Sequence, residues 1–328
     1  MLKLAIDFGT SVTKIYKIGS GIVLAEASCV CVARDTGEIR AFGNDAKRLL
    51  GKTGELTDVV FPVYEGDIVN ERQASALLEY FLKKVIGRSF SVEALFCVPC
   101  GFTAESRERF YRVARNAGVS RVNFVESPFL AALGHDVPLS ESNPVFAIDV
   151  GAGKTSLAVF SLEGVIAGLT MNVGGNNMDV HIIDHIAERF NLKIGVLSAE
   201  KLKNTVGSLI ERDNQSTIVN GRDITTGRPR SVAVSSGDIL FPVRAYVDKV
   251  IEYAEIVLKK LPAEVSATMC KNGICLAGGV CNLAGFADYV SAKLQMEAHL
   301  CADSQMAVVL GGGRAIGNRA LMQKLSME

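Results

Sequence analysis

Two short stretches of this chain are near copies of each other, and this internal repeat constrains the fold more than any other feature. Residues 5–10 read Ala-Ile-Asp-Phe-Gly-Thr and residues 147–152 read Ala-Ile-Asp-Val-Gly-Ala. Each is an apolar strand that ends in an aspartate, a glycine and a small residue, so a carboxylate stands beside a tight turn whose backbone N–H groups can face an anion. One copy would be ambiguous, because Asp-Gly is also a common hairpin turn signal. Two copies, each followed by an alternating strand, predict two similar domains that close on one nucleotide.

The overall charge argues against a nucleic-acid partner. The chain has 328 residues, with 35 Lys and Arg against 35 Asp and Glu, so no long-range field attracts a polyanion. The length allows two domains, and neutrality fits a polymer or a small-molecule ligand better than DNA or RNA. No apolar run approaches the length of a membrane span, so we expect a cytosolic protein.

The order of predicted elements repeats along the chain, and strands alternate with helices in both parts. This alternation predicts mixed sheets covered on both faces, with the ligand in the cleft at the strand ends. The first part has a hairpin up to residue 23, an inserted section over 28–66, helices over 70–85, 104–117 and 128–134, and strands over 94–98 and 122–125. The second part starts at 145 and has helices over 180–190 and 199–210, a hairpin over 216–234, a long helix over 243–261 and a strand over 273–276.

The acids of the repeat are the strongest candidates for chemistry. Asp7 and Asp149 would face the phosphates of a nucleotide, which requires a cation between them. Hydrated Mg²⁺ is held in this way, by one or two carboxylates together with phosphate oxygens. We therefore predict that Asp7 and Asp149 hold Mg²⁺, mainly through water.

Further residues are suited to contact the rest of a nucleotide. Hydroxyl and backbone donors follow Asp7, and Lys14 lies just beyond them. Side chains alternate between the two faces of a strand, so the Lys14 side chain faces either phosphate or solvent. Gly174 precedes a helix whose N-terminus suits an anion, and Gly278 lets the backbone approach a flat ring. The predicted phosphate and base contacts of this kind are Phe8, Gly9, Thr10, Ser11, Thr13, Gly151, Ala152, Gly153, Gly174, Gly175, Asn176, Gly278 and Gly279.

Three other motifs are weaker. Residues 151–155 resemble the end of a P-loop, but the first glycine of that motif would fall on Ile148. His181 and His185 have metal-ligand spacing without a third ligand, which favours an exposed helix face. Cys97 and Cys100 have the spacing of a redox pair, but they end a strand instead of opening a helix.

Taken together, these motifs resemble the superfamily of actin, heat-shock chaperones and sugar kinases, and within it the MreB family of bacterial actins. The resemblance covers essentially the whole chain. It is carried by the two phosphate loops, by Glu126-Ser127-Pro128, and by collinear segments at 19–24, 42–51, 175–179, 199–203, 220–223 and 278–280.

The resemblance implies an actin-like α/β fold, made of two duplicated ribonuclease-H-like domains with ATP or ADP and Mg²⁺ in the cleft between them. It assigns nucleotide contacts to Glu200 and Lys203 in the 199–203 segment. It also implies self-assembly into paired protofilaments at the inner membrane face, with cell-wall elongation machinery as a partner. The implied subdomains are IA (1–27, 67–144, 314–328), IB (28–66), IIA (145–180, 243–313) and IIB (181–242).

Three departures from the family pattern bear on catalysis. The family has Glu directly before the proline, where it orients the attacking water, whereas here Ser127 stands there and Glu126 lies one residue earlier. The second loop continues with Lys154, Thr155 and Ser156 where Thr, Thr and Glu are usual, and the adenosine loop has Val280 where glycine is usual. Among these, Ser127, Glu126 and Thr155 are the catalytic candidates. Nucleotide binding is therefore expected to survive better than hydrolysis. Lys154 either touches a phosphate oxygen or lies solvated at the loop edge.

We therefore predict a nucleotide-gated polymer subunit with slow ATP hydrolysis at most. The alternatives are a non-polymerising nucleotide-binding scaffold and a small-molecule kinase of the same fold. The kinase would need a catalytic aspartate against a substrate hydroxyl, and the chain offers no candidate beyond the metal pair Asp7 and Asp149. The resemblance also places Phe90 in a loop that inserts apolar side chains into the membrane; its alternative is simple packing on the domain.

Overall fold

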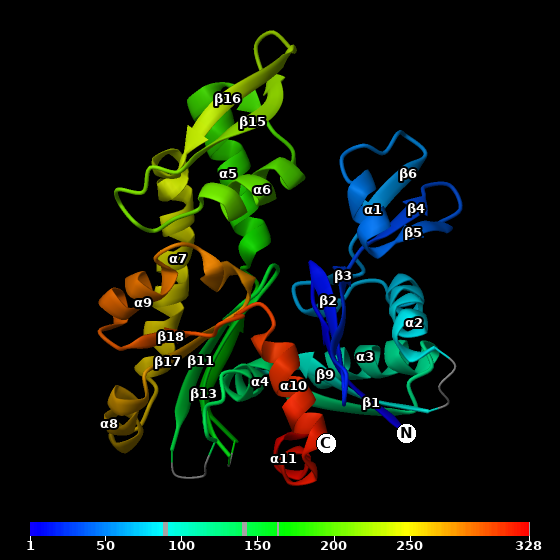
Figure 1. Cartoon of the computed structure of the whole chain (residues 1–328), viewed down its shortest axis with the longest axis vertical. Helices are drawn as coiled ribbons and strands as arrows, with labels where there is room; N and C mark the ends of the chain where they lie inside the picture. Colours follow the sequence, from blue (N-terminus) through cyan, green and yellow to red (C-terminus); the bar gives the residue numbers. More distant parts are fainter. Residues whose placement is uncertain (88–90, 140–142, 163, 328) are drawn as a thin grey trace.

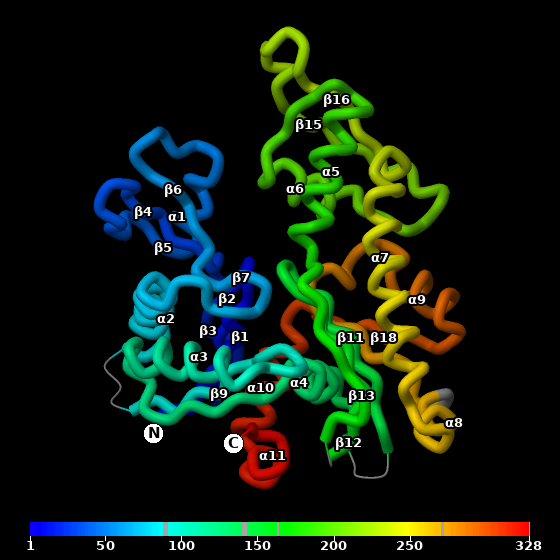
Figure 2. The backbone as a smooth tube through the Cα atoms, turned by 180° about the vertical axis from the view of Figure 1, so that it is seen from behind, coloured from blue at the N-terminus to red at the C-terminus, as the bar shows by residue number. Residues whose placement is uncertain are grey.

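The computed structural model describes residues 1–87, 91–139, 143–162 and 164–327, which form two halves side by side (Figures 1 and 2). Each half is built on a five-stranded mixed sheet. The first has the order β10-β9-β1-β2-β3, with β1 Leu2–Phe8, β2 Val12–Lys17, β3 Gly21–Ala27, β9 Val92–Val98 and β10 Arg121–Glu126. The second has the order β13-β12-β11-β17-β18, with β11 Val145–Val150, β12 Thr155–Ser161, β13 Gly164–Met171, β17 Ile274–Ala277 and β18 Ala298–Leu300.

The two sheets repeat the same pairing rule. In each, the first three strands form an antiparallel meander and the last two run parallel to the first strand. In the first meander Asp7 lies opposite Lys14, and in the second Asp149 lies opposite Ser156. The sequence repeat is thus confirmed as a repeat of topology, which places the two aspartates at equivalent strand ends.

An insert follows the meander in each half, and both inserts lie at the same end of the molecule (Figure 1). The first holds β4 Val30–Ala33, β5 Ile39–Phe42, α1 Gly43–Leu49 and β6 Thr57–Val60, followed by the hairpin β7 Val63–Tyr64 and β8 Asp67–Ile68. The second holds α5 Gly175–Phe190, β14 Leu192–Lys193, α6 Val196–Val206, β15 Ser216–Asp223 and β16 Pro229–Ser235.

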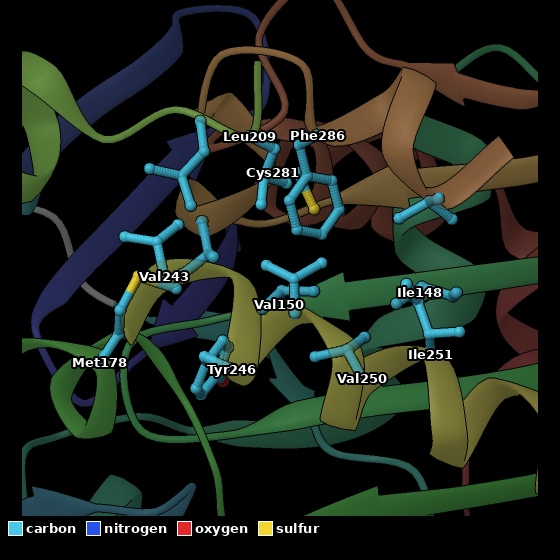
Figure 3. Close-up of a cluster of buried hydrophobic side chains, with 14 of the residues drawn as sticks. Ile148, Val150, Met178, Leu209, Val243, Tyr246, Val250, Ile251, Cys281 and Phe286 are labelled. Carbon is cyan, nitrogen blue, oxygen red and sulfur yellow. The ribbon is translucent and has the colours of Figure 1, made fainter. Parts of the chain in front are cut away.

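Separate cores hold each sheet, and a third core joins them. The helices α2 Glu71–Ile86 and α3 Ala104–Asn116 bury Leu77 and Phe110 against the first sheet. The helices α7 Ser236–Leu258 and α9 Phe286–Leu294 bury Tyr246 and Phe286 with Val150 of the second (Figure 3). Between the sheets lie α4 Ser127–Gly134 and α10 Ala307–Gly317, whose apolar residues form the joining core. The remaining elements are α8 Ala263–Asn272, the 3₁₀ turn η1 Gly279–Asn282 and α11 Arg319–Leu325.

The long helix α7 begins earlier than predicted, at Ser236 instead of residue 243. Ser235 caps it through a reciprocal pair of hydrogen bonds with Asp238, so the helix starts well before Pro242. Because Pro242 lacks an N–H, the Asp238 carbonyl has no intrahelical partner there, and His185 Nε2 contacts it at 2.8 Å. His185 is therefore half-buried and structural, while His181 is exposed on the same helix.

Candidate functional site

A cavity of about 440 Å³ opens between the two halves, and the ends of β1 and β11 contribute to its lining. This volume lies within the usual range of small-molecule sites. The lining draws on loops and helices of both halves, so the site exists only when they come together. Of the residues predicted from the sequence, it includes Asp7, Phe8, Gly9, Thr10, Ser11, Lys14, Ser127, Asp149, Gly151, Ala152, Gly153, Lys154, Gly175, Asn176, Glu200, Lys203, Gly278, Gly279 and Val280.

The two aspartates of the repeat share this cavity with a cation and a hydroxyl. Partial burial and the nearby Asp7 carboxylate raise the pKa of Asp149 to about 6, although a hydrogen bond with Ser127 and the charge of Lys14 oppose the shift. Lys14 Nζ lies 2.8 Å from Asp7 Oδ2. Burial acts to lower the pKa of Lys14, but its bond to Asp7 and the charge of Asp149 outweigh that effect and raise it. Lys14 is therefore an ammonium that faces the cavity, not solvent.

The two glycine loops approach each other across the cavity. A Cβ on Gly153 would lie 2.6 Å from Thr10 Oγ1 of the first loop, so no larger residue fits there without a shift. Within the second loop the Gly151 N–H donates to the Lys154 carbonyl at 2.8 Å, which closes a tight turn. The loop is tied to the start of α5, where the N–H groups of Gly175 and Asn176 donate to the carbonyls of Gly151 and Ala152.

Lys154 crosses from the second half to the first. A Cβ on Gly66, in the turn between β7 and β8, would lie 2.6 Å from Lys154 Cδ, so the side chain rests on that turn. Burial lowers the pKa of Lys154, while the charges of Asp67 and Glu65 act in the other direction. The aliphatic part of the Lys154 side chain therefore packs on the opposite half and is not solvated at the loop edge.

The far end of the cavity is built from α5, α6 and the 278–280 turn. Lys203 lies 2.8 Å from the buried Asp179 and donates to the Gly175 carbonyl at 3.0 Å, so its ammonium is pinned. Gly278 has a φ of +92°, and a Cβ there would lie 2.2 Å from the Val150 carbonyl oxygen, so only glycine fits. Val280 lies against Gly175: a Cβ added at Gly175 would lie 3.0 Å from Val280 Cγ2.

One ion pair joins the two inserts. Lys47 Nζ of α1 lies 2.9 Å from Glu200 Oε1 of α6. Glu200 also lines the cavity. A ligand in the cavity would therefore meet the same residue that pairs with Lys47 of the opposite half.

Four predicted site residues lie outside the lining. Thr155 is fully buried and donates to the Val173 carbonyl at 2.8 Å, because successive residues of β12 alternate between faces and Ser156 takes the cavity side. Glu126 accepts a hydrogen bond from the Gly101 N–H at 2.8 Å. The remaining two are Thr13, which bonds with Ser28 Oγ at 2.8 Å, and Gly174, which is the N-cap of α5.

Some lining residues are not among the nucleotide contacts predicted from the sequence. Asp179 lies inside a helix in an ordinary amphipathic pattern, and only the fold pairs it with Lys203. Cys97 also lines the cavity, but burial raises its pKa well above the usual value. Burial likewise raises the pKa of Cys100 to about 12, so burial disfavours the thiolate form of both residues that redox chemistry needs.

Phe90, the predicted membrane contact, lies outside the described residues. No helix within the described ranges has both the length and the apolar character to cross a bilayer. Among the residues described, no three or more His, Cys, Asp or Glu side chains cluster as metal ligands. An ion held by Asp7 and Asp149 would thus need ligands from water or phosphate, as Mg²⁺ commonly has.

Comparison with known proteins gives a consistent result. The family model "MreB/Mbl protein" matches residues 1–324. The cell shape-determining protein MreB of Escherichia coli is 32% identical over 321 residues, which are 95% of this chain and 92% of that protein. Crystal structures of MreB5 of Spiroplasma citri, at 27% identity, match with a TM-score of 0.90 when bound to AMPPNP (94% of both chains) and 0.92 when bound to ADP (98% of this chain, 97% of that one). The MamK double helical filament, at 22% identity, shares the fold with a TM-score of 0.80 over 97% of this chain and 99% of that one.

Proposed function

This chain belongs to the MreB/Mbl family of bacterial actins, and we propose that it binds ATP in the cavity between its halves and polymerises in response. The observation that carries the proposal is the pair of glycine loops that meet across one cavity, each preceded by a strand-end aspartate. The nucleotides bound to Spiroplasma citri MreB5 support the same ligand class.

The residues of the cavity fit a magnesium nucleotide. Burial and the nearby Asp7 carboxylate raise the pKa of Asp149, so a cation bound between the two carboxylates would be favoured. Asp7 and Asp149 would hold Mg²⁺ through water, and the ion would offset the charge of the phosphates. Thr10, Ser11 and the N–H groups of the second loop would bind phosphate oxygens. Gly278 would lie against the adenine.

Polymerisation follows from closure of the cavity. A ligand that contacts both halves favours the closed arrangement, and the Lys47–Glu200 pair supports the same closure. A closed subunit can then stack head-to-tail, and such a heterologous contact forms open filaments. We propose paired protofilaments that act in cell shape through cell-wall elongation machinery, as the family resemblance implies. Ser127 in place of glutamate supports slow hydrolysis, so the ATP state would persist.

Sedimentation tests this function. We expect the wild-type protein to pellet with ATP and excess MgCl₂ but to remain in the supernatant without nucleotide. In excess MgCl₂ the Asp149→Ala variant should bind ATP up to about tenfold more weakly, because Mg²⁺ would lose one of its two carboxylates. It should therefore pellet only at higher ATP concentrations.

The matched control is Asp184→Ala, on an exposed face of α5 away from the cavity, and it should behave as wild type. Calorimetric binding of ATP without pelleting would favour the scaffold alternative. Transfer of phosphate to a small hydroxyl compound would favour the kinase. Unchanged ATP affinity in Asp149→Ala would contradict the placement of the nucleotide.

We also propose that filaments attach to the inner membrane face through Phe90. One apolar ring in lipid contributes at most about 2 to 3 kcal/mol, so single subunits should bind weakly and filaments firmly through many contacts. Co-sedimentation of filaments with anionic liposomes should therefore fall in Phe90→Ser while pelleting without liposomes stays the same. Equal co-sedimentation of both proteins would remove Phe90 from the proposal.

A further inference from the structure

We propose that Lys14 is a resident counter-cation of the cavity, so that this chain holds a nucleoside triphosphate with little dependence on a divalent ion. The inference rests on the proposed binding of a nucleotide. It concerns which charge balances the strand-end acids, not whether the ligand binds.

The fold places Lys14 against Asp7 by strand register. The two residues lie directly opposite each other in the antiparallel pair β1–β2, so their side chains project from the same face of the sheet. Lys14 Nζ lies 2.8 Å from Asp7 Oδ2, and the two side chains are only 12% and 20% exposed. At this low exposure water screens the two charges poorly. The Lys14 ammonium therefore offsets the Asp7 carboxylate at the place where a ligand in the cavity would meet it.

Lys14 differs from the other lysines of the lining in its partner, which is one of the two strand-end acids. Lys203 is held by Asp179 at the far end of the cavity, and Lys154 packs on the Gly66 turn. Within the described part of the chain, Lys14 is the lining lysine that is paired with a strand-end acid. Its charge also acts on the second acid, Asp149.

The consequence concerns the charge that a polyphosphate meets. Two bare carboxylates repel a triphosphate, and a divalent ion must then offset both groups. With Lys14 present, one carboxylate is already neutralised and one of its oxygens is occupied by an ammonium. Lys14 and a hydrated ion would therefore share the same task, and removal of the ion should cost less affinity here than in a site without the lysine.

The test measures ATP binding by calorimetry in excess MgCl₂ and in EDTA, without reliance on hydrolysis. We expect wild type to lose about tenfold or less in affinity when the ion is removed. Lys14→Met should lose about 100-fold, since a cation within 4 to 6 Å changes the equilibrium of a charged group by about one to three decades. In a second readout, EDTA should release bound ATP faster from Lys14→Met than from wild type.

Two further variants distinguish charge from structure. Lys14→Arg keeps the charge and should retain the weak dependence on the ion. Lys17→Met removes a lysine from the same strand that does not line the cavity, and it should behave as wild type. For each protein the test gives the ratio of ATP affinity in MgCl₂ to ATP affinity in EDTA. If this ratio is the same for wild type and Lys14→Met, and both proteins bind ATP in MgCl₂, the role of Lys14 is overturned. Failure of wild type to bind ATP under any condition would instead contradict the proposed function.

Discussion

Replacing Ser127 with glutamate should raise the rate of ATP hydrolysis by about 10²- to 10⁴-fold, the usual contribution of a positioned acid–base group. Ser127 is the first residue of α4, and its side chain faces the cavity and hydrogen-bonds with Asp149. A glutamate there would carry a carboxylate to the phosphate end of the cavity. A hydroxyl holds water but is a poor base, so the present residue should support only slow turnover.

Phosphate release from polymerised protein at saturating ATP measures this effect. Ser127→Gln is the matched control, because it adds nearly the same volume without a carboxylate and should remain slow. Glu126→Gln tests the neighbouring acid. Glu126 accepts the Gly101 N–H outside the cavity lining, so its loss should not change the rate. Equal rates for wild type and Ser127→Glu would show that position 127 does not face the attacking water.

Replacing Gly311 with alanine should lower the free energy of unfolding by about 1 to 3 kcal/mol or more. This is a large share of the total, because the free energy of unfolding of a native protein is roughly 5 to 15 kcal/mol. Gly311 lies inside α10 where this helix crosses α4, and a Cβ there would lie 1.8 Å from the Leu130 carbonyl oxygen. The crossing is reciprocal, because a Cβ on Gly134 of α4 would lie 2.0 Å from the Ala307 carbonyl oxygen. A backbone obstacle cannot move aside by a rotamer change, so the two helices must separate.

Gly317→Ala provides the control on the same helix. Its nearest neighbour is the flexible Ile18 Cδ1 at 3.4 Å from an added Cβ, so this change should be neutral or slightly stabilising. Thermal and denaturant unfolding measure both variants. Because α10 and α4 join the two sheets, Gly311→Ala should also weaken ligand binding at the cavity. Equal midpoints for the two variants would show that the crossing is looser than the structure indicates.

Local pattern predicted the duplicated strand ends with their acids and glycines, whereas the fold and the cavity residues Ser127, Glu200 and Lys203 came from the family resemblance. The two Asp-Gly stretches are encoded within a few residues each, because a strand end followed by a glycine turn depends on backbone geometry and not on distant contacts. Asp7, Asp149 and the glycines of both loops were therefore identifiable in the sequence, and their meeting at one cavity follows from the duplication. The predicted start of the long helix at residue 243 is wrong, because the Ser235 cap starts α7 at Ser236 and Pro242 lies inside the helix.

The sequence by itself thus determined that two equivalent strand ends would face one another with acids and glycines. Tertiary structure alone decided which neighbour of each pair faces inward: Ser127 and not Glu126, Ser156 and not Thr155. It also decided that Lys14 pairs with Asp7, that Lys203 pairs with Asp179, and that Gly311 lies within a helix crossing. The physical reason is that side-chain direction, charge pairing and the contact of two backbones depend on register and packing between segments far apart in the chain, which local propensity does not encode.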